Sequence, residues 1–141
     1  MNSVFSLVEQ LVALGRPTIV GLQSLLGVTL SPVSDANQYW SLYEAHQSSG
    51  FVASVDFRQP RSGASKHEPL LVVTLRDAAV RLQDLSHKYG SGRITDMSHH
   101  HPSFVGYTYV VHDREVTFKI DSKNERVLGF SIDYSIAQGA Q

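Results

Sequence analysis

The sequence of 141 residues contains no cysteine. Structural disulfides, thiolate nucleophiles and cysteine-ligated zinc or iron–sulfur centres are therefore excluded. It also lacks any run of about 18 consecutive apolar residues, the length that a membrane-spanning helix requires. We therefore expect no membrane span.

Charge is sparse and nearly balanced, with 12 Lys and Arg against 13 Asp and Glu and a net charge of −1. The basic residues are scattered singly along the chain, whereas neutralising the phosphates of a nucleic acid requires clustered cations. Nucleic acid is therefore not an expected partner.

Familiar catalytic motifs are missing as well. The sequence has no Gly-x-Ser-x-Gly elbow, no phosphate-binding Gly-x-x-x-x-Gly-Lys loop and no Gly-x-Gly-x-x-Gly fingerprint. No spacing pairs two acids as a general acid and a general base, and we interpret the acids on predicted strands and loops as solvated surface. We therefore expect neither an enzyme nor a bound cofactor. These acids are Glu44, Asp56, Glu68, Asp121 and Asp133.

The triple histidine that ends at Pro102 is the most conspicuous local feature. In an extended chain His99 and His101 point the same way, and Asp96 can complete a site for a first-row metal. Pro102 instead favours an irregular loop with solvated imidazoles, and no helical His-x-x-x-His pair supports a metal. We expect no metal and keep Asp96, His99 and His101 as candidate binding residues.

An apolar fraction of 42% with 18% charged residues is typical of a folded domain. The chain length is also near the commonest domain size. The first residues carry no basic segment, and Glu9 interrupts the only apolar stretch that resembles a signal sequence. We therefore expect a cytoplasmic protein, or a periplasmic one if a signal peptide has been removed.

Three helices are predicted where apolar residues recur every three or four positions. They span residues 4–14, 18–26 and 77–89. Thr18 and Asp77 are expected to cap the second and third of them.

Strands are predicted from alternating or continuous apolar residues. Residues 35–46 allow either a capped helix or an aromatic-rich strand, and we favour the strand. We expect the apolar run at 70–75 to be a central strand with both faces at least partly covered. In the last two strands Val116, Phe118 and Ile120 should pack while Thr117 and Lys119 face outward. The other predicted strands span 51–58, 104–112, 115–121 and 127–134, and in the last of them Leu128, Phe130, Ile132 and Tyr134 should pack while Ser131 and Asp133 face outward.

These elements predict one α+β domain over residues 1–141, with the N-terminal helices and one mid-chain helix packed on an antiparallel sheet of about six or seven strands. A short similarity between residues 21–27 and 81–85 suggests a helix-then-strands pseudo-repeat over 1–76 and 77–141.

Two aromatic groups are candidates for a binding surface, since Tyr and Trp combine a large contact area with a polar tip. One includes Trp40 and Tyr43, and the other includes Phe104 and Tyr107. Packing in the core is the alternative, and we favour it for Trp40. The polar loop at residues 59–69 is a further candidate contact region, and its Arg61 and Lys66 are candidate binding residues, as is the predicted loop at 96–104.

The succession of residues 25–27, 39–43, 55–60, 70–75 and 82–90 resembles small immunity proteins that accompany secreted antibacterial toxins. It is also similar to the tandem helix-and-sheet architecture of the β-lactamase inhibitory protein family and the outer-membrane lipoproteins related to it. The resemblance implies tight one-to-one binding of a cognate toxin. Many such inhibitors are strongly acidic, which speeds association, whereas this chain has a net charge of only −1.

The leading hypothesis is therefore a non-catalytic immunity protein that inhibits a toxin stoichiometrically. Two alternatives remain open at this stage. An adaptor or secretion chaperone would bind a client protein without abolishing an activity. A small-ligand binder or enzyme would hold its ligand in a cavity between a curved sheet and its helices.

Overall fold

The computed structural model describes residues 3–33, 40–60, 69–98 and 103–135. Within these ranges it contains three helices and eight strands. A helix or strand is present in each region where the sequence predicted one. In chain order they are α1 (Ser3–Ala13), α2 (Ile19–Leu26), β1 (Ser31–Pro32), β2 (Trp40–His46), β3 (Val52–Pro60), β4 (Leu70–Leu75), α3 (Leu82–Tyr89), β5 (Arg93–Ser98), β6 (Phe104–Val111), β7 (Arg114–Asp121) and β8 (Val127–Asp133).

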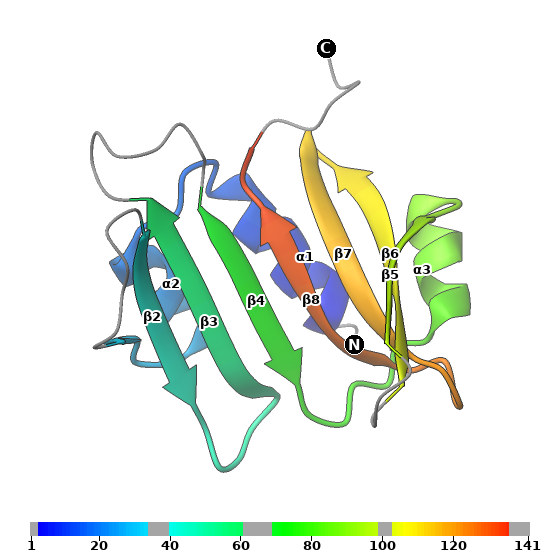
Figure 1. The fold of residues 1–141 in the computed structure, drawn as a ribbon, viewed down its shortest axis with the longest axis horizontal. Helices are drawn as coiled ribbons and strands as arrows, with labels where there is room; N and C mark the ends of the chain where they lie inside the picture. The colour runs from blue at the N-terminus through cyan, green and yellow to red at the C-terminus, as the bar shows by residue number, and fades with distance from the viewer. Residues whose placement is uncertain (1–2, 34–39, 61–68, 99–102, 136–141) are drawn as a thin grey trace.

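All eight strands join one antiparallel sheet, and the helices lie on one side of it (Figure 1). The predicted α+β class is thus confirmed, with slightly more strands than the six or seven expected. The strands missed are β1, which has two residues, and β5. The sequence did not predict β5. This edge strand is exposed along most of its length, so its residues show no apolar alternation. None of the described helices has the length and apolar character needed to cross a membrane.

The strand order is β1-β2-β3-β4-β8-β7-β6-β5, so that two four-stranded meanders meet at β4 and β8. At this seam Gly129 of β8 faces the backbone of β4, and a Cβ there would overlap the Val73 carbonyl oxygen. Glycine is therefore required where the two meanders join. The order suits the suggested pseudo-repeat over 1–76 and 77–141, which stays a prediction.

The N-terminal helices follow the sequence closely. The Thr18 hydroxyl accepts a hydrogen bond from the Gly21 amide at 3.0 Å, as expected of an N-cap. Gly27 ends α2 with a φ of 67°, which glycine adopts without strain. The buried residues of α1 are Val4, Val8, Leu11 and Val12.

The third helix starts later than predicted. Asp77 does not cap it but lies in a turn with a φ of 52°, and the helix begins at Leu82. Between them Ala78 and Val80 are buried, and the Val80 carbonyl accepts a hydrogen bond from Val127 at the start of β8. Alternating burial and pairing with another strand outweigh helix propensity in this segment.

Residues 40–46 form a strand, as favoured, and the remainder of the ambiguous segment lies outside the described residues. The predicted loop at 59–69 begins later than expected, since β3 continues through Pro60. The run at 70–75 forms a central strand with both faces at least partly covered, as predicted. Leu71, Val73 and Leu75 are buried on the helix side, whereas Leu70 and Val72 on the other face are half-buried.

Strict alternation fails at two irregularities. A register shift between Val52 and Ser54 leaves both Val52 and Val55 buried, although strict alternation would place them on opposite faces. A second shift, between Lys119 and Ile120, lies opposite Leu128 and turns it away from the core side chain of Phe130. A bulge inserts one residue and so reverses the face of its neighbours. The other predicted faces of β7 and β8 are confirmed, with Val116, Phe118, Ile120, Phe130 and Ile132 buried.

The core lies between the helices and the sheet. Phe118 has no exposed surface and sits among the rings of Tyr89, Tyr109 and Phe130, with centroids 5.9–6.2 Å away. These distances are typical of favourable aromatic pairs. The core therefore accounts for one face of the sheet and leaves the other free.

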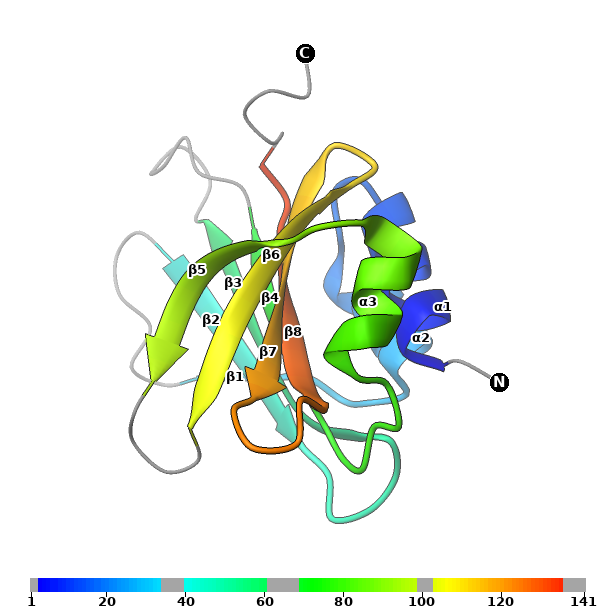
Figure 2. The same ribbon diagram turned by 90° about the vertical axis from the view of Figure 1, so that its right-hand side faces the viewer.

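The sheet curves away from the helices. In Figure 2 the outer strands β2 and β5, near the two edges of the sheet, project to the left while the helices lie to the right of the central strands. The helix-free side of the sheet is consequently concave.

Candidate functional site: the concave face

We call the helix-free side of the sheet the concave face. Its side chains are the cross-strand partners that alternate with the buried ones, so they run across the sheet in rows. The first row is Leu42, Arg58, Leu70, Asp133 and Glu115; the second is Glu44, Asp56, Val72, Ser131, Thr117 and Thr108; the third is Ser54, Thr74, Gly129, Lys119, Gly106 and Asp96.

The middle of the concave face carries small residues. The hydroxyls of Thr95, Thr108 and Thr117 form a hydrogen-bonded chain across β5, β6 and β7, with oxygen–oxygen distances of 2.7 and 2.6 Å. Gly106 and Gly129 add no side chain to this floor. The middle of the concave face is therefore recessed relative to the larger side chains around it.

The edge strand β5 folds over this floor. A bulge between Ile94 and Asp96 bends it, and a Cβ added to Gly106 would lie 3.0 Å from the Cβ of Asp96. Bulges increase bending and twist, and glycine allows the closer approach. The bulge in β5 and the glycine at position 106 together explain why this end of the sheet curls.

Two hollows lie on the concave face and share Val72. The first hollow, of about 350 Å³, lies over β2, β3 and β4, and the second, of about 320 Å³, lies over β4, β8 and β7. Ser98 of β5 and Val72 of β4 both line the second hollow although three strands separate them in the sheet. Only a strongly curved sheet brings them together. The main lining side chains are Leu42, Glu44, Asp56, Arg58, Leu70 and Val72 in the first hollow and Val72, Thr74, Ser98, Phe104, Lys119 and Leu128 in the second.

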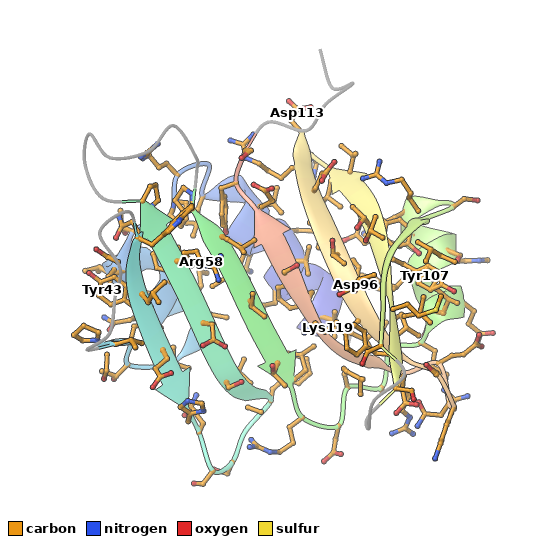
Figure 3. All side chains as sticks on the ribbon, in the orientation of Figure 1. Tyr43, Arg58, Asp96, Tyr107, Asp113 and Lys119 are labelled. Atoms are coloured by element: carbon orange, nitrogen blue, oxygen red, sulfur yellow. The ribbon has the colours of Figure 1, made fainter. Side chains whose placement is uncertain are left out.

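The concave face is more acidic than the chain as a whole. By their strand positions six carboxylates and three basic side chains belong to it, and Figure 3 shows Asp96, Lys119 and Arg58 on this side. The other described Lys and Arg residues lie on helices, in turns and connections or, as Arg114 does, at the start of β7 on the helix side. The concave face therefore has an acidic excess although the charges are nearly balanced in the sequence. The carboxylates are Glu44, Asp56, Asp96, Glu115, Asp121 and Asp133, and the basic side chains are Arg58, Arg93 and Lys119.

Two pairs of these carboxylates are direct cross-strand neighbours, Glu44 with Asp56 and Glu115 with Asp133. Like charges placed opposite each other destabilise a sheet. Arg93 relieves the second pair through an ion pair with Glu115 at 3.3 Å. Within the described residues Asp56 has no ion pair or hydrogen-bond partner of its own. Such a cost to the isolated fold is expected where residues serve binding.

Three of the predicted binding residues belong to the concave face. Trp40 lies under the Arg58 guanidinium at 5.7 Å from its ring centroid, so it is half-buried at the surface rather than in the core. Phe104 lies under the Lys119 ammonium at 5.1 Å. Asp96 is exposed on β5, a strand where a loop was expected.

The other two aromatic residues predicted to bind, Tyr43 and Tyr107, face the helices instead. Tyr43 packs against Phe57 with ring centroids 6.4 Å apart, and Tyr107 lies opposite Phe118 and packs against the core. Aromatic character was visible in the sequence, but the face of a strand residue depends on register. The predicted residues Arg61, Lys66, His99 and His101 lie outside the described residues.

Sequence reasoning missed the centre of the concave face. It interpreted Glu44 and Asp56 as ordinary solvated acids and did not single out Leu42 or Val72. The available signal was the alternation in β3, where Asp56 and Arg58 fall between Val55 and Phe57. Only the pairing of β3 with β2 and β4 places these acids beside exposed apolar side chains.

The helix side carries a polar cluster and a hollow. Glu9 of α1 accepts a hydrogen bond from the Tyr89 hydroxyl at 3.2 Å and contacts His112 Nε2 at 3.0 Å. Burial, followed by the charge of Glu9, raises the pKa of Tyr89. Each member already has a partner, so the cluster ties α1 and α3 to the β6–β7 hairpin. A hollow of about 510 Å³ beside α1 and α2 is larger than those on the concave face, but none of the described residues that line it is charged.

The described part of the chain contains no group of three or more His, Asp or Glu side chains placed to hold a metal ion. Comparison with protein families, with curated proteins and with solved structures found no match to this chain. The concave face is therefore the feature from which a function can be argued.

Proposed function

We propose that this chain is a non-catalytic immunity protein that neutralises a toxin by stoichiometric protein–protein inhibition, and that the concave face docks the toxin. The observation that carries the proposal is the difference between the two faces of the sheet. One face is filled by helices, while the other is concave and bears half-exposed apolar side chains among charges.

The chemistry of the concave face favours a protein partner. Leu42, Leu70 and Val72 supply apolar surface, and the charged side chains of Glu44, Asp56 and Arg58 lie beside them. An apolar centre with a polar rim is the usual anatomy of a protein–protein interface. The two shallow hollows suit side chains of a partner better than a small molecule, which is normally enclosed over most of its surface.

The acidic excess on this face also fits inhibition of a toxin. Complementary charge steers two proteins together and accelerates association, and an inhibitor must act before the toxin does. A local acidic surface provides this steering even though the net charge of the chain is only −1.

Capture followed by growth rescue tests the proposal. The wild-type chain is used to isolate a partner from its native host, and the partner is then expressed in a susceptible strain with and without this chain. We expect the partner to arrest growth alone and the wild-type chain to restore it at equimolar expression. A partner that binds but whose activity persists in the complex would instead indicate an adaptor or secretion chaperone.

Two matched variants, one on the concave face and one outside it, complete the experiment. Val72→Arg places a long charged side chain between the two hollows, and Val20→Arg makes the same substitution on an exposed site of α2. Rescue should be lost with Val72→Arg and kept with Val20→Arg. Equal rescue by both variants would place the interface elsewhere.

A further inference from the structure

We infer that the first hollow receives an arginine or lysine side chain of the partner protein. The inference rests on the proposed function, because it assigns the chemistry of one contact within the proposed interface. It follows from how apolar and acidic groups are arranged in the hollow.

Part of the floor of the first hollow is apolar, although β3 contributes Asp56 and Arg58 between its apolar residues. Leu42, Leu70 and Val72 come from β2 and β4 and are each half-buried, so their exposed surface can cover the methylene stem of a long side chain. Lysine and arginine pack their stems on apolar surface and keep the charged head at a polar boundary. The hollow of about 350 Å³ is large enough for such a side chain.

Two carboxylates stand at one end of the hollow. Glu44 and Asp56 are exposed cross-strand neighbours. Glu44 has only a contact of 3.7 Å with His46, and Asp56 has no ion pair or hydrogen bond within the described residues. A cation placed between them would relieve their mutual repulsion and gain charge-assisted hydrogen bonds.

Arg58 is the basic residue that lines the same hollow, and it leaves the end beside Glu44 and Asp56 open. Arg58 lies between the Trp40–Pro60 and Glu44–Asp56 positions in the register of β2 and β3. Its guanidinium stacks on Trp40, which draws it toward the end of the hollow that is remote from Asp56. The charges are therefore ordered along the hollow, with Arg58 drawn toward one end and two carboxylates at the other, neither of which has a Lys or Arg partner among the described residues.

The second hollow has the opposite character. Lys119 lies over the Phe104 ring, and Leu128 adds a further apolar side chain. Among the described residues no carboxylate lines it. We therefore assign the specificity for a cationic side chain to the first hollow.

An NMR titration of the full chain tests the inference without knowledge of the partner. The ¹⁵N-labelled protein is titrated with Nα-acetyl-arginine N-methylamide and, separately, with the corresponding citrulline amide, which has nearly the same shape but no charge. We expect saturable shifts of the Glu44, Asp56 and Val72 amides with a Kd on the order of 1 mM for the arginine compound. The citrulline compound should cause no saturable change.

Two double variants provide the control. Glu44→Gln with Asp56→Asn should weaken the arginine compound by about tenfold or more, which is about 1.4 kcal/mol. Asp77→Asn with Glu125→Gln removes the same charge from turns beyond the strand ends and should leave the Kd unchanged. Equal effects of the two double variants, equal binding of citrulline, or shifts elsewhere in the chain would overturn the inference.

The two proposals can fail separately. A partner that binds the concave face while its affinity is the same for wild type and for Glu44→Gln with Asp56→Asn would refute the cationic contact and leave the immunity role intact. Binding of arginine in the first hollow by a chain that rescues no toxin would refute the immunity role alone.

Discussion

At the scale of single residues, a few side chains determine how each face of the sheet is used. Thr108 is the one buried polar side chain among the described residues, and it is satisfied by hydroxyls on both neighbouring strands. Residue type singled out Asp96 and Phe104 as candidate binding residues, and both lie on the concave face together with Trp40, for which core packing was favoured; their role in binding stays a prediction. Asp56 is exposed, as expected of a solvated acid, but its place beside Glu44 depends on a strand pairing that no local pattern contains.

Replacing Thr108 with Val removes the centre of the hydroxyl chain. Thr95 and Thr117 then lose a hydrogen-bond partner, although both can turn toward water. We expect the free energy of unfolding to fall by about 1 kcal/mol. Urea unfolding measures the change, with exposed Thr74→Val as a comparison on the same face. A Thr108→Val protein as stable as wild type would show that the hydroxyl chain contributes nothing.

Tyr134 links stability to pH. Its buried hydroxyl donates to the Leu11 carbonyl at 2.9 Å, and burial raises its pKa above the usual value of 10, while Arg114 opposes the shift. Because the folded pKa exceeds the unfolded one, this contribution is complete below about pH 10 and is lost as the pH rises toward the folded pKa. Tyr134→Phe should therefore flatten the fall in urea midpoint between about pH 9 and pH 11. An unchanged slope would contradict this account, even if the variant is less stable throughout.

At the scale of elements, β5 shapes the concave face and is also the element that the sequence concealed. The helices and the β6–β8 meander could be predicted because their buried residues recur with the period of the element. The residues of β5 are almost all exposed, so no period records the strand. The start of α3 was wrong for a related reason, since Ala78 and Val80 are buried against β8 rather than in a helix.

Gly106→Val tests the contact that lets β5 fold over the floor. Its side chain would meet Asp96 and Thr117, so β5 must move outward or the bulge must change. Overpacking of this kind typically costs about 1–3 kcal/mol. We expect amide shifts concentrated in β5 and a loss of toxin rescue in a protein that remains folded. Shifts spread evenly through the core would contradict a local role for this contact.

At the scale of the whole molecule, one face of the sheet holds the core, and we propose that the other face binds the partner. The helix face contains the large buried rings, and the concave face contains half-exposed apolar residues whose removal leaves no internal cavity. The general fold class followed from the sequence, because packing of helices on a sheet requires only the periodic apolar pattern. The curvature did not, since it arises from bulges and glycine contacts between strands far apart in the chain.

A matched pair of phenylalanine substitutions measures this division. Phe118→Ala should lower the free energy of unfolding by about 3–5 kcal/mol, because it empties the centre of the aromatic core. Phe104→Ala on the concave face should cost about 1 kcal/mol or less. Both values follow from chemical denaturation. Similar losses in the two variants would mean that the concave face is part of the folding core.

The most direct test of the account measures binding and stability of Val72→Arg together, with the captured toxin as the ligand in calorimetry. Val72 touches both hollows and lies outside the buried core. We expect one-to-one binding by the wild type and an affinity at least about 100-fold weaker in the variant, with a free energy of unfolding changed by about 1 kcal/mol or less. A folded Val72→Arg protein that binds the toxin as tightly as wild type would contradict docking on the concave face.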